Sequence, residues 1–351
     1  MIAAGRHALV AGATGIVGRR IAECLAASGW QVTGLCRRPP PVALPYQVLA
    51  VDLTDSADCR RKLGDVDATH LIYAARYDHP EGASESVDLN TAMLVNLMDA
   101  VEPAAPSLRH IHLVHGTKYY GHMLGPVPVP LAEEHPRAAG RNFYFTHEDF
   151  IRERQGGARW TFSTSRPHSF IDSNADEPRN LALLIALHAS IARALDQPFD
   201  YPGTETSFRS RTQFTHVPLL ARAIRWMADE PRCANQSYHV VNGDSPRWSE
   251  LWPRFADYFG VEKGVPREMS LARYMADKET VWHALGQRRG LKPTKLSLLV
   301  LWPYAQYVFS PEWDIISGMS KARRDGFNEA IDSAQMFLDI FDSFRADKII
   351  P

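Results

Sequence analysis

The stretch "HALVAGATGIVGRR", residues 7 to 20, joins a short apolar run to three regularly spaced glycines. The run before Gly12 predicts a buried strand, and the residues after Gly15 predict the start of a helix. Gly12 permits a tight turn, Gly15 lets the backbone approach a pyrophosphate, and Gly18 allows close packing of the helix. Because the glycines lie between a strand and a helix, we interpret them as a dinucleotide-binding turn.

Strand-like and helix-like segments continue to alternate after this turn. Strand signals in "QVTGLCR", "YQVLAVDL" and "THLIYAA" are followed by a polar helical stretch over residues 85–101 and a strand over 110–114. A helix over 142–153 and a strand ending at Pro167 complete the series. This rhythm is typical of βαβ units with parallel strands. We predict an α/β fold: a Rossmann doubly wound parallel sheet with a smaller helix-rich substrate-binding region.

The helix-rich region is expected to interrupt the Rossmann domain. We assign residues 1–171 to an NADP-binding Rossmann domain, to which 212–244 return as one more helix and strand. Residues 172–211 and 245–351 form the predicted substrate-binding region.

Two apolar runs in that region, "LALLIALHASIARAL" and "LSLLVLWPYAQYVF", are shorter than the roughly 18 to 20 clean apolar residues that a membrane span needs. We therefore predict buried helices. Trp302, Tyr304, Tyr307 and Phe309 are expected to supply an apolar wall for the substrate, with core packing as the competing explanation.

The amino-acid composition restricts the classes of partner that we expect for this protein. The 39 basic and 40 acidic side chains give a net charge of −1, so no overall field would attract nucleic acid or an anionic membrane. A small molecule is the expected partner, and the oligomeric state, including a homodimer, stays open. Four widely spaced cysteines without a CxxC pair favour inert thiols in a reducing compartment. The first residues lead directly into a strand without a signal-peptide pattern, so we predict a cytoplasmic location.

The second predicted strand ends in "GLCRRP", where an NAD-binding protein normally places a carboxylate. Arg37 and Arg38 suit a 2′-phosphate instead, because a guanidinium matches phosphate oxygens and keeps its charge. NADPH is therefore favoured over NADH, the alternative being a solvated basic pair. Asp52 is expected to face the adenine, and Ala74 and Ala75 keep the next strand end small beside the dinucleotide.

A lysine and a tyrosine stand out near the later strand ends. In "VHGTKYYGHMLGP", residues 114–126, Lys118 follows a strand at the sheet edge where ligands bind in open α/β folds. Short-chain dehydrogenases pair a tyrosine with a lysine in YxxxK on one helix, where the lysine lowers the pKa of the phenol. Here Tyr144 begins a predicted helix but is followed four residues later by Glu148, so we expect Lys118 to replace that cation. The only YxxxK string, Tyr274 to Lys278, is interpreted as a coincidental surface spacing.

Six segments carry a family resemblance: "GATGIVG", "RRP", "HGTKYYG", "PLAEEHPR", "NFYFTHEDF" and "ARRDGF…DSAQMFLDIFDSFRADKIIP". Together they resemble the progesterone 5β-reductase and iridoid synthase-like family over nearly the whole chain. The resemblance implies an atypical extended short-chain reductase that uses NADPH for 1,4-reduction of activated alkenes such as enones and enals. It also implies that Lys118 and Tyr144 are the active-site pair.

The chain departs from the family pattern at four positions. His115 replaces an expected threonine, Tyr119 a histidine and Phe145 a second aromatic that is often tyrosine or tryptophan, while Arg76 stands where a tryptophan is frequent. Because Arg76 and His115 are expected near the pocket, substrate preference can differ from that of the plant enzymes.

The leading hypothesis is an ene-reductase in which Tyr144 and Lys118 stabilise an enolate. Carbonyl reduction or sugar-nucleotide epimerisation on the same scaffold, and a non-catalytic NADPH-sensing regulator, are the alternatives. The natural substrate and the stereochemistry cannot be predicted. The predicted cofactor-binding residues are Gly12, Thr14, Gly15, Ile16, Val17, Arg37, Arg38, Asp52, Leu53, Ala74, Ala75, Lys118, Tyr144 and Ile171.

Overall fold

The structure, a computed structural model, describes residues 5–77 and 85–351. Its centre is a sheet of seven parallel strands in the order β10-β6-β5-β4-β1-β2-β3. The order reverses direction between β1 and β4, which is where doubly wound sheets bind their ligands. The predicted fold class is confirmed. The strands are β1 (His7–Ala11), β2 (Gln31–Cys36), β3 (Gln47–Ala50), β4 (His70–Tyr73), β5 (His110–Val114), β6 (Thr161–Pro167) and β10 (Gln236–Val240).

Helices cover both faces of this sheet. One face packs against α1 (Ile16–Ala27) and α7 (Val217–Asp229), and the other against α2 (Ser56–Leu63), α3 (Val87–Ala104) and α4 (Phe143–Gln155). The residues from Ala8 to Ala11 of β1 are all fully buried, because helices cover both faces of the sheet. This double burial explains why the strand is a continuous apolar run in the sequence. A 3-10 turn, η1 (Thr117–Tyr120), follows β5 directly.

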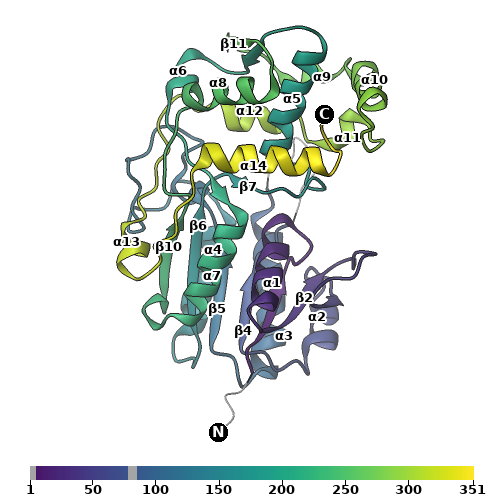
Figure 1. Cartoon of the computed structure of the whole chain (residues 1–351). Coiled ribbons are helices and arrows are strands. Elements are labelled where there is room, and N and C mark those ends of the chain that lie inside the picture. Colours follow the sequence, from purple (N-terminus) through teal and green to yellow (C-terminus); the bar gives the residue numbers. More distant parts are fainter. Residues whose placement is uncertain (1–4, 78–84) are drawn as a thin grey trace.

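A helix-rich region lies over the carboxyl ends of the strands, and its helix α14 (Ser333–Ala346) lies on the side nearest the sheet (Figure 1). Its core is built around α5, whose residues from Leu181 to Ala192 are all buried. The apolar run there is thus a core helix, and no helix in the described ranges is long and apolar enough to cross a membrane. The region contains α5 (Leu181–Ala194), α6 (Glu205–Arg209), α8 (Trp248–Phe259), α9 (Leu271–Met275), α10 (Glu279–Arg289), α11 (Leu296–Leu299), α12 (Tyr304–Phe309), α14 (Ser333–Ala346), and the pair β8 (Phe199–Tyr201) with β11 (Lys263–Pro266).

Two segments cross back between the regions. The parallel pair β7 (Phe170–Ile171) and β9 (Thr215–His216) leads into α7, and η2 (Pro231–Cys233) leads into β10. Further on, α13 (Ser320–Arg324) lies on β10, where the Lys321 ammonium donates to the Gln236 side chain at 2.7 Å and to the Ser237 carbonyl at 3.0 Å. This part of 245–351 therefore packs on the Rossmann sheet, because Met319 and Phe327 share the apolar core of α1 and α7.

Buried histidines join neighbouring strands of the sheet. His110 and His112 of β5 both hydrogen-bond the Ser163 hydroxyl of β6, each at 2.8 Å. Burial lowers the pKa of His110 to about 3 and that of His70, on β4, to about 4. Both rings therefore stay neutral in the folded chain at pH values where the same histidines bind protons in the unfolded chain.

Stability is therefore expected to fall on acidification from pH 6.5, the ordinary histidine value, towards pH 4. Each such ring removes about 1.4 kcal/mol of unfolding free energy per pH unit in that window, because only the unfolded chain takes up the proton. Melting temperatures between pH 7 and 5 measure the slope. A His110→Gln variant should show a shallower slope than the parent protein. Equal slopes in the two proteins would contradict this interpretation.

Candidate active site

The glycine turn packs backbone against backbone. Gly12 has a positive φ of 81°, and a Cβ atom there would lie 2.7 Å from the Ala74 carbonyl oxygen at the end of β4. A Cβ atom on Gly18 would lie only 2.2 Å from the Gly12 carbonyl oxygen. Gly15, by contrast, is exposed, and its Cβ would meet nothing closer than 3.4 Å. The turn thus presents an open backbone surface at the N-terminus of α1, next to the exposed Thr14.

The other predicted cofactor residues lie along the same edge of the sheet. Arg37 and Arg38 are exposed directly after β2, and neither guanidinium has a hydrogen bond or ion pair to another described residue. Asp52 follows β3, and its carboxylate accepts hydrogen bonds from Thr54, which lower its pKa with help from the charge of Arg37. The remaining members of the set are placed as follows: Ile16 and Val17 open α1, Leu53 is buried after β3, Ala75 follows β4, and Ile171 is buried at the end of β7.

Asn142 joins the segments that carry the predicted lysine and tyrosine. It is the N-cap of α4, and its side-chain oxygen accepts the Tyr144 backbone N–H at 3.0 Å. Its amide nitrogen donates to the Lys118 carbonyl in η1 at 3.4 Å. One buried side chain therefore both starts the helix of Tyr144 and contacts the turn of Lys118.

The Tyr144 ring lies at the carboxyl ends of β5 and β6. A Cβ atom on Gly116 would be 3.4 Å from the Tyr144 hydroxyl, so glycine leaves room for that group. The ring stacks on His115 with centroids 4.8 Å apart, and burial keeps the pKa of His115 far below its usual range. Burial also raises the pKa of Tyr144, with a contribution from the charge of Glu85. The phenol is thus protonated, and it has no hydrogen-bond partner within the described ranges.

Lys118 has a partner that sequence reasoning missed. Its ammonium donates a hydrogen bond to Glu85, whose carboxylate also lies 3.7 Å from the Arg76 guanidinium. No hydrogen bond or ion pair joins Lys118 to Tyr144 in the described part of the chain. Glu85 carried no sequence signal because it precedes α3 and reaches Lys118 only through the fold.

A pocket lies between the Rossmann sheet and the helix-rich region, beside η1. The Thr117 hydroxyl of η1 hydrogen-bonds His168 at 2.6 Å, and His168 lines the pocket. Aromatic and polar side chains thus share its wall, and most of them were not predicted. The lining residues are His122, Met123, His168, Ser169, Ser207, Ser210, Arg211, Thr212, Trp248, Tyr307, Val308, Pro311, Trp313 and Ile315.

Comparison with known proteins identifies the family. The PRISE-like Rossmann-fold domain matches residues 50–351. The chain belongs to this PRISE-like family. It is 32% identical to the short chain dehydrogenase gsfE of Penicillium aethiopicum over 99% of both chains. It is 31% identical to 3-oxo-Delta(4,5)-steroid 5-beta-reductase of Arabidopsis thaliana, covering 98% of this chain and 93% of the relative. It is also 31% identical to (S)-8-oxocitronellyl enol synthase of Catharanthus roseus, covering 98% and 92%.

The resemblance predicted from the motifs is confirmed, and this PRISE-like protein is an oxidoreductase of the short-chain dehydrogenase/reductase superfamily. Solved structures agree on the fold. UDP-glucose 4-epimerase of Thermus thermophilus in complex with NAD has a TM-score of 0.67 at 16% identity, covering 97% of this chain and 99% of the epimerase.

Two further predictions can be compared with the structure. Tyr274 and Lys278 lie in the helix-rich region, where the Tyr274 hydroxyl donates to Gln197, so their YxxxK spacing lies apart from the site. Of the aromatic residues in the predicted wall, Trp302 and Phe309 are buried in the helical core, and Tyr307 lines the pocket. Core packing is thus the correct explanation for the first two.

The glycine turn gives a stability prediction for the PRISE-like protein. Gly18→Ala should lower the free energy of unfolding by about 1–3 kcal/mol, because the new methyl group would overlap the Gly12 carbonyl. Gly15→Ala should cost at most about 1 kcal/mol, since space is open there and only the N-cap preference changes. Denaturant unfolding of both variants measures the difference. Equal losses would show that the close approach at Gly18 does not exist in solution.

Proposed function

We propose that the protein is an NADPH-dependent reductase of activated C=C bonds, acting on conjugated carbonyl compounds such as enals and enones. The observation that carries the proposal is the Tyr144 phenol. It is protonated, lacks a partner among the described residues, and lies at the sheet edge between Gly116 and the end of β6. Such a donor suits an oxygen on which negative charge develops. The names of the plant relatives, a steroid 5-beta-reductase and an enol synthase, support the same chemistry.

The residues present fit a dinucleotide. A Cβ atom at Gly12 or Gly18 would fill the space that the turn needs, and the exposed Gly15 leaves the backbone open to a pyrophosphate at the N-terminus of α1. Arg37 and Arg38 would hold a 2′-phosphate, because both are exposed after β2 and are not engaged by other described residues. NADPH, when bound, would supply a hydride to the β-carbon of the conjugated system.

The protein side chains act on the carbonyl end of the substrate. Tyr144 donates a hydrogen bond to the carbonyl oxygen as it becomes an enolate, and the ammonium of Lys118 adds positive charge at this edge. Glu85 supports this pairing, because its carboxylate pairs with Lys118 and its charge also acts on the Tyr144 phenol. The α-carbon then takes a proton from solvent. Trp248, Tyr307 and Trp313 offer the apolar body of a substrate a wall in the neighbouring pocket.

A substrate panel tests the proposal against its alternatives. Enals, cyclic enones, steroid enones, saturated ketones and a nucleotide sugar are each supplied with NADPH, and the loss of reduced-nicotinamide absorbance is followed. We expect oxidation of NADPH with at least one conjugated carbonyl compound and none with the saturated ketones. Turnover of only saturated ketones or the nucleotide sugar would favour carbonyl reduction or epimerisation. Tight NADPH binding without any turnover would indicate a sensor.

Cofactor preference should depend on the two arginines after β2. Replacing Arg37 and Arg38 by Gln should weaken NADPH binding by about 1.5–3 kcal/mol for each lost charge-assisted contact to the phosphate. NADH binding should be nearly unchanged, because NADH lacks that phosphate. Dissociation constants for both cofactors, measured by fluorescence titration, check this. Equal weakening of NADPH and NADH would mean that the arginines have a structural role.

Removing the phenol hydroxyl should damage turnover selectively. We expect Tyr144→Phe to fold and bind NADPH normally but to lose about 10²- to 10³-fold in kcat, as when one oxyanion donor is removed. Strongly activated enals, whose enolates need less stabilisation, should lose least. Lys118→Met should lower kcat and also weaken the binding of NADPH. The fold-loss of kcat in the double variant should be smaller than the product of the two single losses. Unchanged kcat in Tyr144→Phe with a good enone would exclude this phenol as the donor.

A further inference from the structure

Glu148 occupies the position where a YxxxK helix would carry its lysine. It lies one helical turn after Tyr144 on α4, and its side chain is only 3% exposed. Burial raises the pKa of this carboxyl, but hydrogen bonds from Arg152 and the charge of Arg166 outweigh that effect and lower the pKa overall. At the position where a YxxxK helix has a cation, this chain therefore has a buried carboxylate.

One oxygen of Glu148 reaches the turn that carries the catalytic lysine. The Tyr119 hydroxyl donates to Glu148 Oε2 at 2.9 Å, and Tyr119 directly follows Lys118 in η1. The Tyr119 ring packs edge-to-face on Phe145, the residue after Tyr144, with centroids 5.2 Å apart. The turn and the helix are therefore joined beside both catalytic residues.

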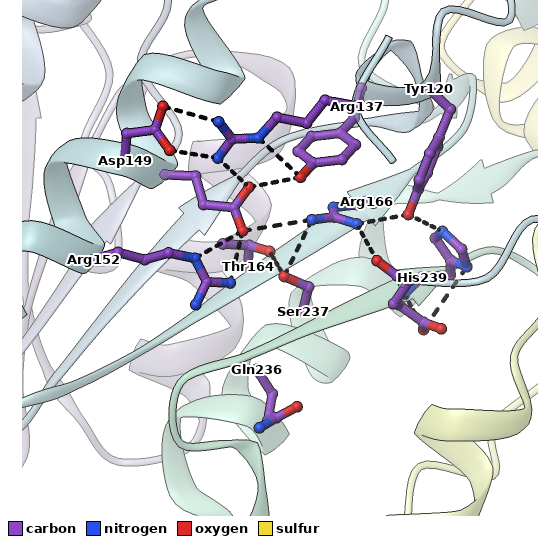
Figure 2. A network of polar contacts seen from close by, with 12 residues as sticks. Tyr120, Arg137, Asp149, Arg152, Thr164, Arg166, Gln236, Ser237 and His239 are labelled. Carbon is purple, nitrogen blue, oxygen red and sulfur yellow. Dashed lines mark hydrogen bonds and ion pairs between the residues drawn. The ribbon is translucent and has the colours of Figure 1, made fainter. Parts of the chain in front are cut away.

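Cations contact both oxygens of Glu148. Arg137 donates to Oε2 at 3.1 Å, and Arg137, Arg152 and Arg166 lie together in one network of polar contacts (Figure 2). Arg152 donates to Oε1 at 2.8 Å, and the buried Arg166 guanidinium approaches the same oxygen to 3.7 Å. Arg166 also lies 3.6 Å from the centroid of the Tyr119 ring and donates to the Tyr120 hydroxyl at 2.7 Å. The side chain of Arg166 comes from β6, so one network holds η1, α4 and the sheet together.

We infer that Glu148 is a positioning residue for the reductase: through the Tyr119 hydroxyl it fixes the Lys118 turn against the helix of Tyr144. The inference rests on the proposed function, and it explains how a lysine displaced to another segment keeps a defined place. Helix α4 has the carboxylate of Glu148 where a YxxxK helix has its lysine, and this carboxylate contacts the turn that carries Lys118. Asn142 adds only a longer contact of 3.4 Å between the same two segments.

The test compares Tyr119→Phe with Tyr238→Phe. Both changes remove a buried tyrosine hydroxyl that donates to a carboxylate at 2.9 Å, but Tyr238 bonds Asp325 far along the chain from η1 and α4. Glu148→Gln and the double variant Tyr119→Phe/Glu148→Gln complete the set. Steady-state kcat and KM for an enal, the NADPH dissociation constant and the melting temperature are measured for each.

We expect Tyr119→Phe and Glu148→Gln to lower kcat by about 10- to 100-fold, because a misplacement near 1 Å has an effect of that size. Tyr238→Phe should lose a similar amount of melting temperature but keep kcat within about twofold. The double variant should be about as active as the less active single variant, because the pair acts as a unit.

If Tyr119→Phe has the same kcat as Tyr238→Phe, the inference is overturned. The proposed function stands in that case, provided that the parent enzyme is active. A parent enzyme that reduces no conjugated carbonyl compound would overturn the proposed function itself. If Glu148→Gln does not fold, Tyr119→Phe decides the question, because it keeps the aromatic packing.

Discussion

The buried guanidinium of Arg166 constrains the architecture of the site. A charge that is 2% exposed is strongly destabilising unless it is paired and hydrogen-bonded. Glu148 supplies the opposite charge, and the Tyr120 hydroxyl and the Glu133 carbonyl accept hydrogen bonds, while Nε of the guanidinium has no hydrogen-bond partner among the described residues. These three partners come from three separate segments. Those segments are α4, η1 and the loop that follows it. The chain can therefore bury Arg166 only when the helix of Tyr144 and the turn of Lys118 both lie against β6.

The parallel sheet supplies the other half of the site. Because all seven strands run in one direction, the glycine turn after β1, the arginine pair after β2 and the η1 turn after β5 emerge at one edge. The helix-rich region lies over this edge (Figure 1), and residues from both parts line the pocket.

Local signals were enough to predict the fold and the strand and helix ends at which several candidate residues lie. The glycine spacing, the strand ends and the helix start at Tyr144 depend on neighbours in sequence, and the structure places them as predicted. Glu85 and His168 could not be predicted, because each reaches the site from a segment tens of residues away. For the predicted aromatic wall, the competing explanation of core packing holds for Trp302 and Phe309, because an apolar run does not reveal which of its side chains meet the core. The absent helix lysine was visible in the sequence, but the network that occupies its place was not.

The central claim is that hydride is added to the carbon–carbon double bond and not to the carbonyl carbon. The most direct measurement follows deuterium from NADPH deuterated at the transferable position of the nicotinamide into the product of an enal, by mass spectrometry and NMR. The account predicts deuterium at the β-carbon of a saturated aldehyde. Deuterium at the carbinol carbon of an unsaturated alcohol would contradict it.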